Sequence, residues 1–148
     1  MLSFRVLLLL ACLLPALPLT AQAQSAAPDD EALIRATVQT YFDGWAVGDT
    51  AKVSAAMHAT CHLKFVNNGV FGARDKRSYL SGFKPHPKGN TQARILTLHR
   101  TGHAAAVVCQ ITSGPNRFTD YFNMLRIDGR WFITDKVAIR EELTAPPK

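Results

Sequence analysis

The chain has 148 residues, of which 47% are hydrophobic and 19% charged, a composition typical of one ordinary globular domain. Its formal net charge is +6 at pH 7, but the basic residues are scattered, and the densest run, residues 74–77, contains an acid. Nucleic-acid-binding proteins concentrate lysine and arginine on one face or arm. We therefore expect no nucleic-acid partner.

Residues 1–23 have the pattern of a signal peptide. Arg5 supplies a positive charge, an apolar run follows from 6 to 19, and residues 21–23 (AQA) have the small side chains that a signal peptidase recognises. Two prolines interrupt the apolar run, which is too short to span a bilayer comfortably. We expect an exported protein, periplasmic or secreted, with no membrane contact after cleavage. A lipid anchor at Cys12 is the alternative.

Two helices are predicted next. Apolar residues recur at spacings of three and four from Ile34 to Trp45, which predicts an amphipathic helix that begins at about Asp30, after a flexible lead-in at 24–30. Gly48 is placed to end this helix in the left-handed conformation. The residue after it, an aspartate, can cap a second, shorter helix.

A strand pair and a third helix follow. Residues 61–65 alternate between apolar and polar, which predicts a strand, and the Asn-Asn-Gly sequence at 67–69 turns the chain back into a partner strand. Apolar spacing predicts a short helix within residues 74–83. Residues 84–90 contain two prolines and a glycine and are predicted to form an extended loop at the rim of a cavity.

Four strands complete the chain. Residues 91–100 and 103–112 form one predicted pair, and residues 117–137 form a long hairpin that turns at Asp128-Gly129, a pair that readily adopts positive φ angles. The order of helices and strands predicts an α+β fold, in which a curved, mainly antiparallel sheet carries the helices on its concave face.

We expect this fold to occupy residues 31–142 as one domain, followed by a disordered tail at 143–148. Cys61 and Cys109 both fall in apolar strand patterns, where a free thiol behaves as a small buried hydrophobic group. An oxidising compartment also permits one disulfide between them. The apolar setting favours two separate thiols.

Three local patterns carry a resemblance. Tyr41 stands seven residues before Gly48-Asp49, a strand follows Met57-His58, and the hairpin at Asp128-Gly129 is followed by Trp131. With these patterns the chain resembles the nuclear transport factor 2-like superfamily, the cone-shaped fold of ketosteroid isomerase, scytalone dehydratase and the SnoaL-type cyclases. The residues most similar to its putative lumazine-binding subfamily are Phe118, Thr119, Asp120, Tyr121, Phe122, Leu125, Trp131, Ile133 and Lys136.

The resemblance implies a cavity between the sheet and the helices. Tyr41 is similar to the tyrosine with which ketosteroid isomerase hydrogen-bonds a developing oxyanion, although a core aromatic residue is the alternative. Counted back from the final turn, Asn123 falls where that isomerase keeps a protonated aspartate. Counted forward from Gly48, the position of the general base falls on Phe65, which argues against isomerase activity.

Asp120 stands among aromatic residues of a central strand and therefore needs either a raised pKa or a cationic partner, for which Lys136 is available. The alternative is an ion pair that only fixes the register of the hairpin. Asp120 and Asn123 are an odd number of positions apart, so only one of them can line the cavity of an unbulged strand. His58 is a candidate base, or else a residue that interacts with the helix dipole.

No motif for a cofactor or a metal is present, and we expect neither. His58, Cys61 and His62 are close in sequence, but a change from helix to strand separates them and no second ligand pair follows. The sequence also lacks a phosphate-binding glycine loop and a nucleophilic serine motif.

Three functions remain open. The first is an exported domain that binds an apolar or aromatic small molecule, with polar contacts from Asp120 or Asn123. The second is a dehydratase, cyclase or isomerase in which Asp120 or His58 is the acid-base and Tyr41 the oxyanion donor. The third is a homodimeric interaction module with a filled cavity. The predicted ligand-binding residues are Tyr41, Trp45, Phe65, Phe122, Asn123 and Lys136.

Overall fold

The computed structural model describes residues 29–143. The expected signal peptide, most of the expected lead-in and most of the expected tail lie outside these residues. The elements, in chain order, are α1 (Asp30–Trp45), α2 (Thr50–Ala56), β1 (His62–Asn67), β2 (Val70–Asp75), α3 (Lys76–Leu80), β3 (Gln92–Thr101), β4 (Ala104–Ser113), β5 (Asn116–Ile127) and β6 (Arg130–Glu142). This is the order that the sequence predicts.

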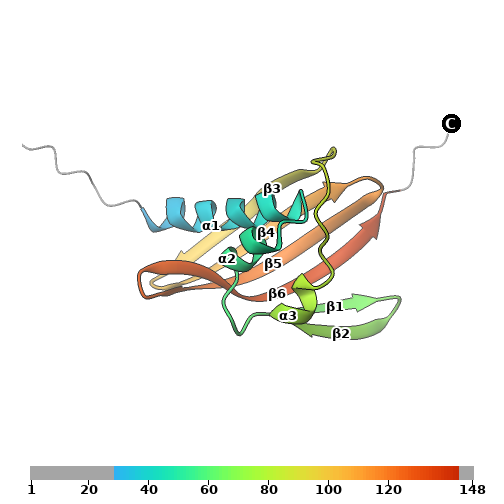
Figure 1. The fold of residues 1–148 in the computed structure, drawn as a ribbon. Coiled ribbons are helices and arrows are strands. Elements are labelled where there is room, and N and C mark those ends of the chain that lie inside the picture. Colours follow the sequence, from blue (N-terminus) through green and yellow to red (C-terminus); the bar gives the residue numbers. More distant parts are fainter. Residues whose placement is uncertain (1–28, 144–148) are drawn as a thin grey trace, which may run out of the picture.

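The strands form one six-stranded sheet in the order β2-β1-β6-β5-β4-β3 (Figure 1). Every neighbouring pair is antiparallel except β1 and β6, which run parallel. The β5–β6 turn has φ angles of 48° at Asp128 and 78° at Gly129, as a tight two-residue hairpin requires. The predicted α+β fold with a mainly antiparallel sheet is therefore confirmed.

The helices lie on one face of the sheet (Figure 1). On β5, Asp120, Phe122 and Met124 point to this face and are each 1% exposed, whereas Tyr121 and Asn123 are exposed on the opposite face. Because side chains alternate along a strand, a slip of one residue would reverse this arrangement. The register of β5 therefore decides which polar groups can face the helices.

The third helix is shorter than the sequence predicts. Arg74 and Asp75 belong to β2, where they pair with Leu63 and His62 of β1. The carboxylate of Asp75 then accepts a hydrogen bond of 2.7 Å from the amide of Ser78 and caps the helix start. Because residues 74 and 75 are paired in the sheet, α3 begins only at Lys76. Arg74 therefore lies on a strand, beside the cavity described below.

Cys61 and Cys109 are both free and buried. Burial raises the pKa of Cys61 to about 11, with a further contribution from the charge of Asp135. Burial raises the pKa of Cys109 to about 12, with a further contribution from Asp120. Because the thiolate is the reactive form, both groups are poor nucleophiles at neutral pH.

We predict that neither thiol reacts with Ellman's reagent in the folded protein at pH 8, and that both react after unfolding in guanidinium. The measurement is the absorbance of the released thionitrobenzoate with and without denaturant. The protein is used without residues 1–23, which contain Cys12. Failure of this unfolded, unreduced protein to release two equivalents would reveal a disulfide and contradict the structure.

Candidate functional site

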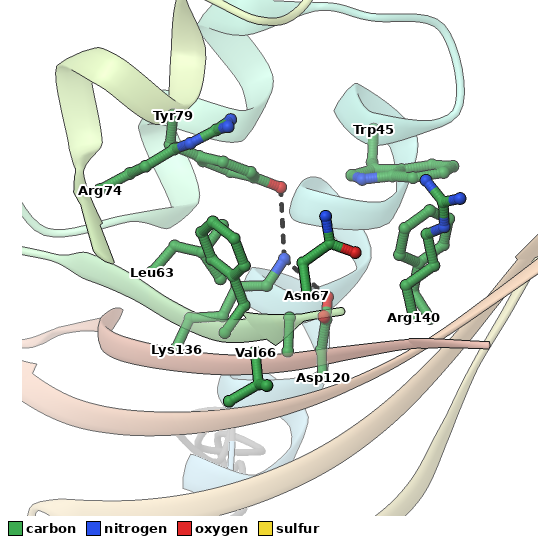
Figure 2. Close-up of a pocket in the computed structure, with 12 residues that line it drawn as sticks. Trp45, Leu63, Val66, Asn67, Arg74, Tyr79, Asp120, Lys136 and Arg140 are labelled. Atoms are coloured by element: carbon green, nitrogen blue, oxygen red, sulfur yellow. Dashed lines mark hydrogen bonds and ion pairs between the residues drawn. The ribbon is translucent and has the colours of Figure 1, made fainter. Parts of the chain in front are cut away.

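A cavity of about 260 Å³ lies between the sheet and the ends of α1 and α3 (Figure 2). We call it the lysine cavity. Aromatic rings from four different elements form much of its wall, together with one asparagine and four charged side chains. The residues that line it are Trp45, Leu63, Phe65, Val66, Asn67, Arg74, Tyr79, Phe118, Asp120, Lys136, Ala138 and Arg140.

Four polar side chains meet at the base of the cavity, and Figure 2 shows three of them, Asp120, Lys136 and Tyr79. Lys136 Nζ lies 2.9 Å from Asp120 Oδ2, donates a hydrogen bond to the hydroxyl of Tyr41, and donates another of 3.2 Å to the hydroxyl of Tyr79. The two hydroxyl oxygens are 2.6 Å apart. We call these four residues the lysine cluster.

The fold brings the cluster together from four elements. Lys136 of β6 pairs with Phe122 of β5, so Asp120 is its diagonal neighbour on the same face of the sheet. Tyr41 comes from α1, where its spacing from the other buried residues directs it to the sheet. Tyr79 is the buried residue of α3. All four members are at most 9% exposed.

Lys136 is charged in this setting. Burial acts to lower its pKa, but the negative charge of Asp120 and the contact with Tyr79 outweigh burial and raise the pKa above its ordinary value. Burial, followed by the neighbouring Tyr79 and Asp120, raises the pKa of Tyr41 well above its ordinary value. At neutral pH the cluster therefore contains an ammonium group and a protonated Tyr41 hydroxyl.

The lysine cluster can offer a ligand one hydroxyl proton. The hydroxyl oxygens of Tyr41 and Tyr79 each accept from Lys136, and the contact between them uses one of their two hydroxyl protons. Tyr41 is completely buried, whereas Tyr79 lines the cavity. When Tyr41 donates to Tyr79, the proton of Tyr79 is free to donate into the cavity.

Asp120 can act as a hydrogen-bond acceptor for the same ligand. Its Oδ2 lies 2.9 Å from Lys136 Nζ, which is within reach of the third ammonium proton, whereas Oδ1 accepts no hydrogen bond from any residue in the described part of the chain. A buried carboxylate oxygen without a hydrogen-bond donor is unfavourable. The base of the cavity thus presents an acceptor beside a donor hydroxyl.

The rim of the cavity is positively charged. Arg74 and Arg140 line it, and within residues 29–143 neither has a carboxylate partner. The guanidinium carbon of Arg74 lies 5.5 Å from the centre of the Phe65 ring. With Lys136 and Asp120 included, three cations and one anion line the cavity, so its field favours an anionic ligand.

Of the predicted ligand-binding residues, Trp45, Phe65 and Lys136 line the cavity. Tyr41 does not line the cavity and is connected to it only through its hydrogen bonds with Tyr79 and Lys136. Phe122 does not line it, because its ring packs edge-on against Tyr41 at 5.1 Å between centroids and is 1% exposed. Phe122 therefore packs against the lysine cluster from within the core.

Two other predicted residues are elsewhere. Asn123 is on the opposite face of the sheet, because it is an odd number of positions from Asp120 on the pleated strand. His58 does not line the cavity either: its Nδ1 is 2.8 Å from the hydroxyl of Thr60, and its ring packs against Phe132. Of the predicted catalytic residues, only Asp120 lines the cavity.

Sequence reasoning missed Tyr79, Phe118, Arg74 and Arg140 as cavity residues. The apolar inward positions of β5 include Phe118, so alternation along that strand was an available signal. For Tyr79 there was none, because its partners Tyr41 and Lys136 are 38 and 57 positions away in the sequence.

Other kinds of site find no support among residues 29–143. No group of three histidine, cysteine, aspartate or glutamate side chains in this range is arranged to hold a metal ion. In the same range, no helix combines the length and apolar character needed to cross a bilayer.

The chain matches one protein family over most of its described length. The model of a family described as Putative lumazine-binding matches residues 29–137. No curated protein gives a significant match.

Several solved structures share the fold. A nuclear transport factor 2-like protein from Silicibacter pomeroyi superposes with a TM-score of 0.70 at 18% identity, over 75% of this chain and 95% of that one. One from Shewanella baltica gives 0.69 at 21% identity, over 75% and 93%. A ketosteroid isomerase-like protein from Erwinia carotovora gives 0.59 at 15%, over 74% and 94%. At these identities the likeness shows the fold alone.

We predict that Lys136→Met destabilises the protein by about 3–5 kcal/mol, because it leaves the Asp120 charge buried without a partner. The double variant Asp120→Leu/Lys136→Met should recover most of this loss, since no buried charge then remains. The measurement is the free energy of unfolding in urea.

The matched control is Lys64→Met. Lys64 pairs with Asp135 at 2.6 Å, but their side chains are 45% and 30% exposed, so we expect a loss of only about 0–1 kcal/mol. Equal losses in Lys136→Met and Lys64→Met would contradict a special role for the buried pair.

Proposed function

The chain belongs to the Putative lumazine-binding family of the nuclear transport factor 2-like fold, and from that membership we propose that it is an exported domain that binds a planar heteroaromatic molecule in the lysine cavity. The observation that carries the proposal is the buried Asp120 carboxylate, which lines an aromatic-walled cavity and whose Oδ1 accepts no hydrogen bond from residues 29–143. Export rests on the signal-peptide pattern of residues 1–23.

The arrangement of donor and acceptor suits the edge of a heterocycle. A ring N–H can donate to Asp120, while an adjacent ring carbonyl can accept from the Tyr79 hydroxyl. Lumazine, the compound in the family's description, is a bicyclic dione with this alternation of N–H and C=O along one edge. Trp45, Phe65 and Phe118 supply the apolar faces that pack against such a ring.

The cavity supports binding better than catalysis. An acid-base mechanism needs its groups within hydrogen-bond reach of one substrate. His58 is outside the cavity, Tyr41 is shielded by Tyr79, and Asp120 is held against Lys136 at 2.9 Å. An enzyme built here would have to use Asp120 as its acid-base and Tyr79, in place of Tyr41, as its oxyanion donor.

We predict that lumazine binds the purified protein, raises its melting temperature and changes the fluorescence of Trp45, which lines the cavity. Asp120→Asn should weaken binding at least about tenfold, because its amide offers one acceptor oxygen in place of two and ends the ion pair. The measurement is a fluorescence titration, with circular dichroism to verify that the variant is folded.

The control is Asn123→Ala, a change on the opposite face of the same strand that should leave the affinity unchanged. If neither lumazine nor any other bicyclic heterocycle produces a shift, the binding proposal fails. Equal weakening by Asn123→Ala and Asp120→Asn would place the ligand outside the lysine cavity.

A second candidate function is self-association through the outer face of the sheet. Tyr121 of β5 pairs with Val108 of β4 and Val137 of β6, so the three side chains lie in a row on the face that the helices leave open. Tyr121 is 49% exposed and Val137 41%. A contiguous exposed apolar area of this kind is typical of an interface, and we propose that a second copy of the chain covers it.

We predict a dimer at micromolar concentrations, and we predict that Val137→Lys converts it to a monomer, because a lysine opposite its own copy would be desolvated and repelled. Sedimentation velocity measures both. Val70→Lys, the same change at a 69% exposed position in β2, should leave the dimer intact. A monomeric parent protein at 100-fold higher concentration would refute self-association.

A further inference from the structure

A second cleft opens beside the lysine cavity. It has a volume of about 460 Å³ and shares the wall residues Trp45, Arg74 and Tyr79 with that cavity, so the two spaces are neighbours. The second cleft adds Lys84 and His86, which belong to the loop after α3. We call it the loop cleft.

The loop cleft has a strongly one-sided charge. Arg74 and Lys84 line it, His86 stands beside them, and its lining includes no aspartate or glutamate. Within the described residues, neither Arg74 nor Lys84 forms an ion pair. These two cations are therefore available to a ligand.

The loop that carries Lys84 and His86 is held in place by its backbone. The amide of His86 donates a hydrogen bond of 3.0 Å to the carbonyl of Val47, in the turn between α1 and α2. A Cβ atom at Gly48 would lie 2.0 Å from the carbonyl oxygen of Lys84, and the φ angle of Gly48 is +67°. Only glycine permits this approach, so the turn fixes the position of both basic residues.

The two compartments therefore differ in chemistry but share part of their walls. The lysine cavity has aromatic walls and a donor–acceptor pair at its base, whereas the loop cleft is open and basic. Arg74 lies on the boundary, with its guanidinium group over the Phe65 ring. A ligand whose ring fills the first compartment can thus extend a charged substituent past Arg74 into the second.

We propose that the loop cleft is an anion subsite, and that the ligand of this protein is an aromatic compound with a carboxylate or phosphate tail bound by Arg74, Lys84 and His86. This inference rests on the proposed function, because the lysine cavity must hold the ring. Anionic oxygens accept charge-assisted hydrogen bonds from such groups, and the guanidinium plane of Arg74 can bind two of these oxygens together.

The test uses three compounds with one ring system: 2-naphthol, 2-naphthoxyacetate and 2-naphthyl phosphate. Isothermal titration of the full exported protein in 50 mM salt measures their affinities. We expect 2-naphthol to bind weakly, and at least one anionic compound to bind about tenfold tighter or more, with an advantage that shrinks in 500 mM salt because exposed charges are screened. The better of the two anions identifies the tail as carboxylate or phosphate.

Variants locate the tail. The double variant Lys84→Gln/His86→Gln should abolish the advantage of the anionic compounds and leave the affinity for 2-naphthol unchanged. Lys88→Gln is the matched control, because Lys88 is an exposed lysine of the same loop and lines neither compartment. It should leave all three affinities unchanged.

The outcomes separate this inference from the proposed function. If 2-naphthol binds but the anions bind no tighter, the anion subsite is overturned and the ring site stands. An advantage that survives in the double variant and disappears in Arg140→Gln places the tail at the opposite rim and also overturns it. If none of the three compounds binds, the ring site fails and the subsite fails with it.

Discussion

The buried ion pair between Lys136 and Asp120 is the interaction on which the site depends. Removing two charges from water costs several kcal/mol each, and their mutual attraction offsets this only when further hydrogen bonds satisfy the remaining polar atoms. On the lysine side, Tyr41 and Tyr79 supply those hydrogen bonds. These tyrosines belong to α1 and α3. The hydrogen bonds that satisfy the ammonium group therefore also hold two helices against the two longest strands of the sheet.

The carboxylate side of the pair is incomplete, and this asymmetry has a functional meaning. A protein that needed only stability could replace such a pair by apolar side chains at little cost, and often with a gain. Retaining a buried carboxylate with one oxygen that lacks a hydrogen-bond donor is the kind of local conflict that proteins tolerate at binding sites. Asp120 therefore offers a hydrogen-bond acceptor, and Tyr79 a hydroxyl proton, to a ligand in the same cavity.

Features of the fold and the site that depend on neighbouring residues could be predicted from the sequence, whereas features that depend on residues far apart in the chain could not. The hairpin turn at Asp128-Gly129 and the odd spacing of Asp120 and Asn123 are local, and the sequence was sufficient for both. Ungapped counting nevertheless offered Asn123 as a cavity residue, because the apolar residues of β5 occupy even and odd positions alike and do not by themselves indicate the inward face. The register shift next to Asn123, between β5 and β6, belongs to the folded sheet and has no comparable sequence signal.

The walls of the cavity were not predictable for a further reason. β1 pairs with β6 in parallel, so no turn joins the two strands, and only the folded chain shows that Leu63 lies opposite Lys136 and Phe65 opposite Ala138. The wall therefore consists of short elements added to the edge of a long hairpin: β1 and β2 have six residues each and α3 has five. β2 is almost wholly exposed, whereas the base of the cavity is in the core. Short, exposed elements open more readily than buried ones, so β2 is the part of the wall most able to move, whereas the hydrogen bonds of Tyr79 hold α3 to the charged base.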